Sequence, residues 1–390
     1  MLLREGRFAG RSGLRYDAFV RRAYFAEAAS AAKAESGTSS PAKAEARVHT
    51  EGRGSEEEQE SGSFAPALQS RLCPSHVRLL KPVVRERQET GGWRWNRADM
   101  RKRWIVTGAG VAAGAYAGWA YGIAYRTLHP ARLPITQTPA DHGFDYEGVE
   151  FYSADGLRLR GWWIPAAKPR GVAVCLHSYG GNRSEFLPFL PIFQEAGFSV
   201  LAFDFRGLGA SDGTYTALGL EEPADARGAV RWARARLRGR PMVLFGRSLG
   251  GAVALMEAGQ NPHIAGVITD SAYVRLDRTL GGLFRHHWRP LRPAARLFTA
   301  ALLRRKTGLG PEYAAPVESL DLLGARPALV IFGDQDGAVP PPAEAELREA
   351  AGPKVQIWVV PGAGHGEVWA LAESEYRSRV QDFLAQLTRS

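Results

Sequence analysis

Cysteine is scarce in this chain of 390 residues. Only Cys73 and Cys175 are present, and two cysteines cannot build a disulfide framework. Cys175 lies in the apolar run VAVCL, where a cysteine packs as a small hydrophobic side chain. No CxxC or HExxH spacing occurs, so the sequence indicates no metal site, and we expect no cofactor.

Acidic residues are outnumbered in the first part of the chain. Residues 1–103 hold 20 Lys and Arg against 13 Asp and Glu, so they carry +7 of the formal net charge of +10. The remaining residues are close to neutral. The sequence therefore gives no support for a nucleic acid as partner.

Residues 1–99 lack the sustained apolar periodicity of helices and strands and are rich in Ala, Arg, Glu, Ser and Gly. This composition predicts a disordered extension. A second interpretation is that the segment is wrongly included upstream sequence, because Met100 directly precedes three basic residues and an apolar stretch. Acidic residues among the first 27 positions disfavour a mitochondrial presequence.

Charged residues are missing from Trp104 to Tyr125, over 22 positions. At about 1.5 Å per residue, a helix of this length spans a bilayer core. With the basic residues 101–103 before it, the segment predicts a membrane anchor over residues 100–126 and places the rest of the chain outside the cytoplasm. A cleaved signal peptide is the alternative interpretation.

Glycine recurs every four residues along this segment, which aligns the glycines on one helix face. Such a face allows close packing of two helices, so a homodimer is an open prediction. The GAG turn at residues 108–110 also resembles a dinucleotide-binding motif, but the apolar stretch and proline-containing linker that follow disfavour that interpretation. The aligned glycines are Gly110, Gly114, Gly118 and Gly122.

After a linker over residues 127–144, strand and helix patterns alternate. A hairpin is predicted first, with strands Gly148–Tyr152 and Leu157–Ile164 joined at Ala154-Asp155-Gly156. A hairpin followed by alternating strands and helices predicts a mostly parallel sheet of about eight strands with helices on both faces. The further strands are expected at 171–177, 198–203, 242–245, 263–269, 327–332 and 355–360, and the helices at 186–196, 220–237, 251–257, 343–351 and 368–387.

The stretch PMVLFGRSLGG at 241–251 carries a glycine-bracketed serine between an apolar strand and a helix. This is the pattern of a nucleophile elbow, in which Ser248 sits on a sharp turn. The N–H groups at the start of the following helix then face the position where negative charge develops. Leu249, directly after the serine, would supply one such N–H group.

A base, an acid and a second N–H donor are predicted on other loops that follow strands. His365 lies on a glycine-rich loop after the last strand, and Asp336, with Asp334 beside it, follows the strand before. The chain order of serine, acid and histidine is that of one particular fold. The Tyr179 N–H, in the loop after the 171–177 strand, is the predicted second oxyanion donor.

Five motifs in this order resemble the α/β-hydrolase superfamily, specifically its serine hydrolases with a small lid. They are LHSYGGN (176–182), DFRGLGASDG (204–213), GRSLGG (246–251), GDQDGAVP (333–340) and GAGHG (362–366). The resemblance implies a hydrolase domain over residues 145–390 and assigns the acid to Asp336 rather than Asp334. The sequence departs from the family pattern at one position: Ser178 replaces the glycine that usually follows the histidine of the oxyanion loop.

In this fold a lid is inserted where residues 272–324 lie, and its apolar side chains would line an acyl pocket or pack the lid on the body. The resemblance, together with the anchor, is to bacterial membrane-attached esterase-like hydrolases. It implies a serine hydrolase acting on a small-molecule ester or acyl substrate through Ser248, His365 and Asp336. Amide, peptide or thioester cleavage, and a catalytically silent binding module on the same fold, stay as alternatives.

Overall fold

The computed structural model describes residues 96–389. The chain divides into two compact units, residues 1–104 and 105–390, and all strands of the described part lie in the second. The predictions for residues 1–99 fall outside the described residues, except at 96–99, where helix α2 (Arg97–Leu128) begins.

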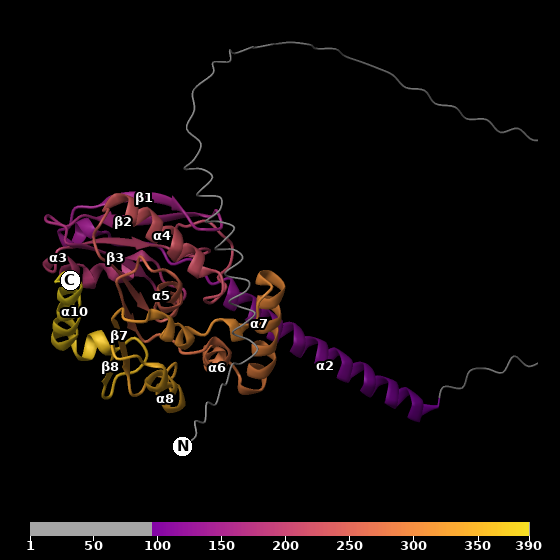
Figure 1. Ribbon diagram of the computed structural model, residues 1–390. Coiled ribbons are helices and arrows are strands. Elements are labelled where there is room, and N and C mark those ends of the chain that lie inside the picture. Colours follow the sequence, from indigo (N-terminus) through magenta and orange to yellow (C-terminus); the bar gives the residue numbers. More distant parts are fainter. Residues whose placement is uncertain (1–95, 390) are drawn as a thin grey trace, which may run out of the picture. The chain divides into compact units, whose positions relative to one another are not determined.

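An eight-stranded sheet forms the centre of the second unit (Figure 1). Its strand order is β1-β2-β4-β3-β5-β6-β7-β8; β2 pairs antiparallel with β1 and β4, and every other neighbouring pair is parallel. The predicted hairpin and mostly parallel sheet are therefore confirmed. The strands are β1 (Glu147–Tyr152), β2 (Arg158–Ile164), β3 (Gly171–Leu176), β4 (Phe198–Phe203), β5 (Met242–Arg247), β6 (Gly266–Asp270), β7 (Ala328–Gly333) and β8 (Val355–Val360).

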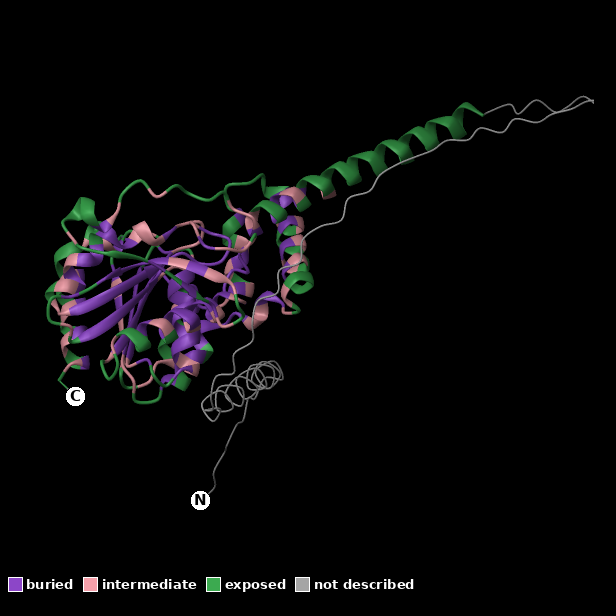
Figure 2. Ribbon diagram, turned by 90° about the horizontal axis from the view of Figure 1, so that it is seen from above, coloured by how far each residue is buried: buried purple, intermediate pink, exposed green. Residues whose placement is uncertain are grey.

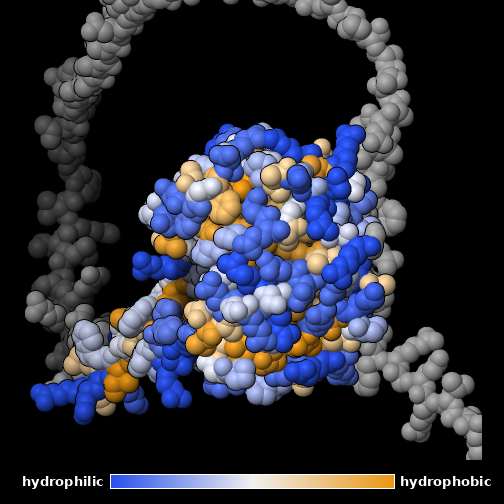
Figure 3. Space-filling model, turned by 90° about the vertical axis from the view of Figure 1, so that its left-hand side faces the viewer, coloured by the Kyte–Doolittle hydropathy of each residue, from blue (hydrophilic) through white to orange (hydrophobic). Residues whose placement is uncertain are grey.

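Helices cover both faces of the sheet, which explains why β3, β4, β6 and β7 are buried along their whole length (Figure 2). One apolar cluster joins the sheet to α4 (Glu222–Arg236), α5 (Leu249–Gln260) and α8 (Pro341–Ala350). A second cluster lies on the other face with α3 (Leu190–Glu195), α9 (Val368–Leu371) and α10 (Glu373–Leu387). On the face seen in Figure 3, hydrophilic side chains alternate with groups of hydrophobic ones.

Two predicted helices are divided in the structure. The one expected at 186–196 begins as a 3-10 helix over Arg183–Phe189, with Pro188 inside it, and becomes α3 only at Leu190. Proline lacks the N–H that an α-helix interior requires, which accounts for the change. The closing helix, expected at 368–387, is interrupted at Ala372, whose φ of −136° and ψ of 39° are not helical.

Helix α2 covers the segment that the sequence predicts as a membrane anchor. The helix is present, but its prediction as a membrane span is not supported: no helix within residues 96–389 is both long enough and apolar enough to cross a bilayer. The physical reason is composition, because 12 of the 22 residues from 104 to 125 are Ala or Gly, which contribute little apolar area.

The last turns of α2 pack against the apolar cluster that contains α4 and α5. Ala120, Ile123, Ala124 and Leu128 are buried, and the Leu128 carbonyl accepts a hydrogen bond from the Thr216 N–H. Earlier positions of the helix are exposed. A Cβ added at any of the four aligned glycines would meet nothing within 4 Å, and the homodimer predicted from them stays untested.

The region predicted as a lid, residues 272–324, contains α6 (Leu276–Thr279), α7 (Arg292–Thr307) and several 3-10 turns. Its apolar side chains divide between two environments. Phe284 and Leu291 are buried in the core, whereas Trp288 and Leu297 are more than 60% exposed. Most of the buried apolar side chains of this region therefore pack it against the rest of the domain.

Close approach of α4 to the β-hairpin predicts an unusual response to a glycine substitution. In a helix interior, Gly→Ala normally raises the free energy of unfolding by about 1 kcal/mol. At Gly228 the new Cβ would lie 2.3 Å from the Tyr152 carbonyl oxygen, so we expect G228A to lower it by about 1–3 kcal/mol. G108A, in the exposed part of α2 with no atom within 4 Å, should show no loss in the same urea titration. A stabilised G228A would contradict the packing described.

Candidate active site

Ser248 occupies a strained turn between β5 and α5. Its φ is +50°, a left-handed value that non-glycine residues rarely adopt, and its N–H donates to the Asp270 carbonyl at 2.8 Å. The glycines on either side of the turn are required because a side chain there would clash with the backbone. A Cβ on Gly246 would lie 2.2 Å from the Gly250 oxygen, and one on Gly250 would lie 1.8 Å from the Leu176 oxygen. The local sequence thus forces the serine side chain outward at the carboxyl edge of the sheet.

Ser248, His365 and Asp336 form a hydrogen-bonded chain. The distance from Ser248 Oγ to His365 Nε2 is 2.9 Å, and His365 Nδ1 lies 2.9 and 3.1 Å from the two carboxylate oxygens of Asp336. Since a carboxylate can only accept, it holds the proton on Nδ1 and leaves Nε2 to accept from the serine. The Asp336 side chain is fully buried and also accepts from the Ala338 N–H at 2.8 Å.

Asp334, the neighbouring carboxylate, has a different contact. Its Oδ1 accepts from the Gly362 N–H at 2.8 Å, which ties together the loops after β7 and β8. Of the two acids considered from the sequence, Asp336 is therefore the one that contacts His365.

The two residues predicted to supply oxyanion N–H groups line the same pocket as Ser248. Leu249 is the first residue of α5, a position whose N–H has no acceptor within the helix. Tyr179 lies beyond β3, and its hydroxyl donates to the Thr127 carbonyl at the end of α2, 2.8 Å away. Burial raises the pKa of the Tyr179 hydroxyl to about 12, so it stays protonated near neutral pH.

Ser178, where the resembling family usually has glycine, is held by Glu185. The backbone N–H and the hydroxyl of Ser178 both donate to that carboxylate at 2.7 Å. His177 before it is buried and fixed by two bonds: Nδ1 lies 2.8 Å from the Ser178 carbonyl and Nε2 accepts from the Phe205 N–H at 3.0 Å. Ser178 thus adds a side-chain hydrogen bond to Glu185 that a glycine at this position could not form.

Arg247, the residue before the serine, connects the loops around the site. Its guanidinium donates to Asp270 at the end of β6, to Glu185, and to the Gly366 carbonyl beside His365, at 3.0, 2.8 and 2.8 Å. Burial by itself would lower the pKa of Arg247, but the carboxylates of Asp270 and Glu185 outweigh it and raise the pKa. The guanidinium therefore stays charged and holds three loops against one another.

The loop after β4 is tied down by buried ion pairs, as its Asp and Arg led us to expect. Asp204 accepts from the Arg183 guanidinium at 2.8 Å and from the Ala210 N–H at 2.8 Å. Arg206 is 3% exposed and bonds Asp225 at 2.7 Å. These groups shape the loop and do not line the pocket of Ser248.

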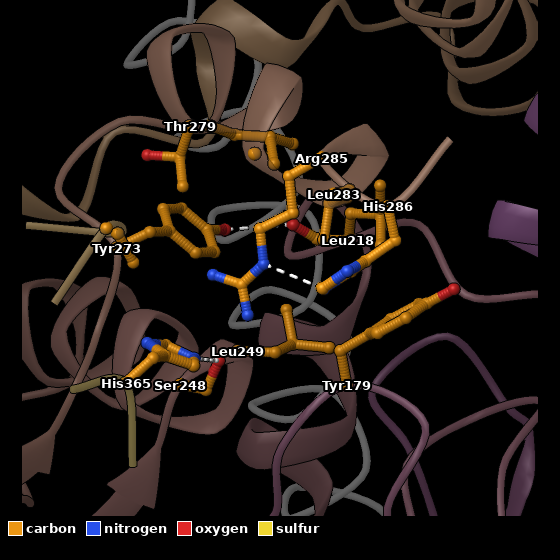
Figure 4. A pocket seen from close by; sticks show the side chains of 14 residues that line it. Tyr179, Leu218, Ser248, Leu249, Tyr273, Thr279, Leu283, Arg285, His286 and His365 are labelled. Atoms are coloured by element: carbon orange, nitrogen blue, oxygen red, sulfur yellow. Dashed lines mark hydrogen bonds between the residues drawn. The ribbon is translucent and has the colours of Figure 1, made fainter. Parts of the chain in front are cut away.

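A cavity of about 260 Å³ opens above Ser248 and His365 (Figure 4). Its walls come from the loops after β3, β5, β7 and β8, from the segment before α4 and from the predicted lid. No cluster of three or more metal-ligating side chains occurs among residues 96–389. The lining residues are Tyr179, Leu218, Ser248, Leu249, Tyr273, Leu276, Thr279, Gly282, Leu283, Arg285, His286, Gly337, Ala338 and His365.

Three residues that form ion pairs around the site could not be identified from the sequence alone. Arg247 and Asp270 occupy predictable places, before the serine and at a strand end, but nothing in the sequence pairs them. Glu185 reaches Ser178 and Arg247 only through the tertiary fold.

Comparison with known proteins agrees with this architecture. The family model "Alpha/beta hydrolase family" matches residues 173–377, more than half of the chain, and the chain belongs to this family. The uncharacterized protein YfhR of Escherichia coli is 29% identical over 248 residues, which are 61% of this chain and 80% of YfhR. The superfamily expected from the motifs is thereby confirmed.

Two further relatives extend the comparison. An uncharacterized membrane protein of Saccharomyces cerevisiae, YNL320W, is 27% identical over 278 residues, 70% of this chain and 87% of its own length. The solved structure of the Pyrococcus furiosus esterase Pf2001 has 27% identity and a TM-score of 0.57, covering 67% of this chain and 98% of the esterase.

The ion pair between Arg247 and Asp270 predicts a measurable coupling. The Asp270 side chain is fully buried, so R247M leaves its charge without the main partner, and we expect the free energy of unfolding to fall by about 3–5 kcal/mol. Adding D270N should restore about 1 kcal/mol or more, because the unpaired charge is then gone.

R348M serves as the control for this cycle. Arg348 pairs with Glu344 on the exposed face of α8, and its loss should change the free energy of unfolding by less than about 1 kcal/mol. Strictly additive effects of R247M and D270N would contradict the role assigned to the pair.

Proposed function

We propose that this chain is a serine hydrolase that cleaves carboxylic ester bonds through Ser248, His365 and Asp336. The observation that carries the proposal is the continuous hydrogen-bonded chain from the Ser248 hydroxyl to the buried Asp336 carboxylate. A cavity directly above the serine gives a substrate access to it. A binding module without catalytic activity would have no need of this arrangement.

In the proposed reaction, Ser248 Oγ attacks the ester carbonyl while His365 Nε2 accepts the hydroxyl proton. Asp336 keeps the imidazole oriented and stabilises its charged form. The N–H groups of Leu249 and Tyr179 would stabilise the oxyanion, each by roughly 3–4 kcal/mol in the transition state. His365 then gives the proton to the leaving alcohol, and water releases the acyl group from the serine by the same steps in reverse.

Esters are favoured over amides and thioesters by one comparison. The Pyrococcus furiosus protein Pf2001 is named an esterase, and it is 27% identical to this chain over 67% of this chain's length. Amidase, peptidase or thioesterase activity with the same three residues is the alternative, because the leaving group is selected by pocket contacts.

Steady-state hydrolysis of 4-nitrophenyl butyrate tests the proposal. We expect S248A and H365A to lower kcat by roughly 10⁴-fold or more, and D336N by a similar factor through loss of the correct imidazole tautomer. H263A is the matched control, since His263 does not line the pocket, and should keep wild-type kinetics. A folded wild type without turnover would refute the proposal and favour the silent binding module.

We also propose that α2 attaches the chain to a membrane surface without crossing the bilayer. Trp104, Ile105, Val106 and Trp119 are each at least 63% exposed, and the basic residues 101–103 suit an anionic lipid surface. A relative in yeast is named as a membrane protein. The side of the membrane stays a prediction, outside the cytoplasm.

Fractionation of cells that express the full chain tests this attachment. We expect the chain in the membrane fraction and its release by alkaline carbonate, as for a surface-bound protein. Resistance to carbonate would show a spanning helix instead, and recovery in the soluble fraction alone would refute attachment.

A further inference from the structure

The lid carries the positive charge of the hydrolase domain. Residues 272–324 hold nine Lys and Arg against four Asp and Glu, a net charge of +5, whereas the whole domain, residues 145–390, carries only +2. The rest of the domain is therefore slightly acidic. A basic lid over a slightly acidic body raises the local concentration of anions at the cavity that the lid covers.

Arg285 brings this charge into the cavity above Ser248. Among the 14 lining residues it is the only Lys or Arg, and no Asp or Glu lines the cavity. In Figure 4 its guanidinium extends from the lid toward Ser248 and Leu249. Most of the remaining wall is apolar, supplied by side chains such as Leu218, Leu276 and Leu283.

The guanidinium of Arg285 is positioned but not neutralised. Its Nε donates to His286 Nε2 at 2.9 Å, and its carbonyl accepts from the Arg292 guanidinium. Its Nη1 also lies near the backbone of Gly337, where an added Cβ would be 3.9 Å away. Within residues 96–389 Arg285 forms no ion pair, whereas Arg275 and Arg278 of the same lid pair with Glu346.

We propose that Arg285 binds a carboxylate or phosphate group of the substrate, so that the preferred substrates are esters with an anionic group close to the scissile bond. The proposal rests on the serine hydrolase function above and specifies its substrate class. A guanidinium presents a planar fork of donors that matches both anions, and the cavity offers them no other Lys or Arg side chain. His286, accepting at Nε2 from Arg285, fixes the orientation of the fork.

Two pairs of substrates test the subsite, each similar in size and differing in charge. For an anion on the acyl side, 4-nitrophenyl hemiadipate is compared with its methyl ester. For an anion on the alcohol side, 4-carboxyphenyl butyrate is compared with 4-carbamoylphenyl butyrate. The readout is the ratio of kcat/KM between the charged and the neutral member of each pair.

We expect the wild type to prefer the charged member of at least one pair by about fivefold, since the guanidinium is exposed to solvent. R285Q should abolish this preference and R285K should retain part of it. Higher salt should reduce the preference, because ionic strength screens exposed charges. R289Q removes another exposed lid arginine outside the cavity and should keep the wild-type ratio.

Equal kcat/KM for both members of both pairs in the wild type would overturn the subsite, as would a ratio that R285Q leaves unchanged. Labelling by a fluorophosphonate separates this failure from failure of the proposed function. Wild type that reacts with the probe but shows no charge preference retains the hydrolase and loses only the subsite. Wild type that neither reacts nor turns over any ester loses both.

Discussion

The geometry of the candidate site depends on one partly buried guanidinium. Arg247 occupies the position before the serine, so its backbone belongs to the elbow while its side chain reaches three other segments. Its contacts fix the loop after β3 through Glu185, the end of β6 through Asp270, and the loop of His365 through the carbonyl of Gly366. Hydrogen bonds of about 3 Å between Ser248, His365 and Asp336 require loops from distant parts of the chain to be positioned within a fraction of that distance. Arg247 supplies that positioning from the centre of the site.

The same network explains how the loop tolerates a serine where glycine is usual in the family. Ser178 donates twice to Glu185, and Glu185 in turn accepts from Arg247. The loop that would provide the Tyr179 N–H is thus connected to the elbow that provides the Leu249 N–H. In the proposed reaction, this connection would keep the two N–H groups in place before a substrate enters, as electrostatic catalysis requires.

The sequence predicted the sheet and the three central residues because each depends on local pattern. Apolar runs place the buried strands, and loops after parallel strands meet at one edge, so Ser248, Asp336 and His365 could be expected near one another. Their hydrogen bonds follow that expectation. The motifs, rather than the periodicity, separated Asp336 from Asp334.

Contacts between segments far apart in the chain could not be predicted from the sequence. Nothing in it pairs Arg247 with Glu185, and nothing shows that Arg285 lines the cavity while Trp288 does not. The membrane span was predicted from the absence of charge in residues 104–125, but absence of charge is not the same as high hydropathy when alanine and glycine dominate. The interruption of the closing helix at Ala372 likewise could not be predicted, because no proline or glycine lies there.

The activation of Ser248 is tested by identifying the residue that a fluorophosphonate modifies. Wild-type protein is treated with the probe, digested, and its peptides are sequenced by mass spectrometry. We expect one phosphonylated residue, Ser248, because only a serine whose hydroxyl is activated by a neighbouring base reacts readily with such a probe. Modification of a different residue, or of none in the folded protein, would contradict it.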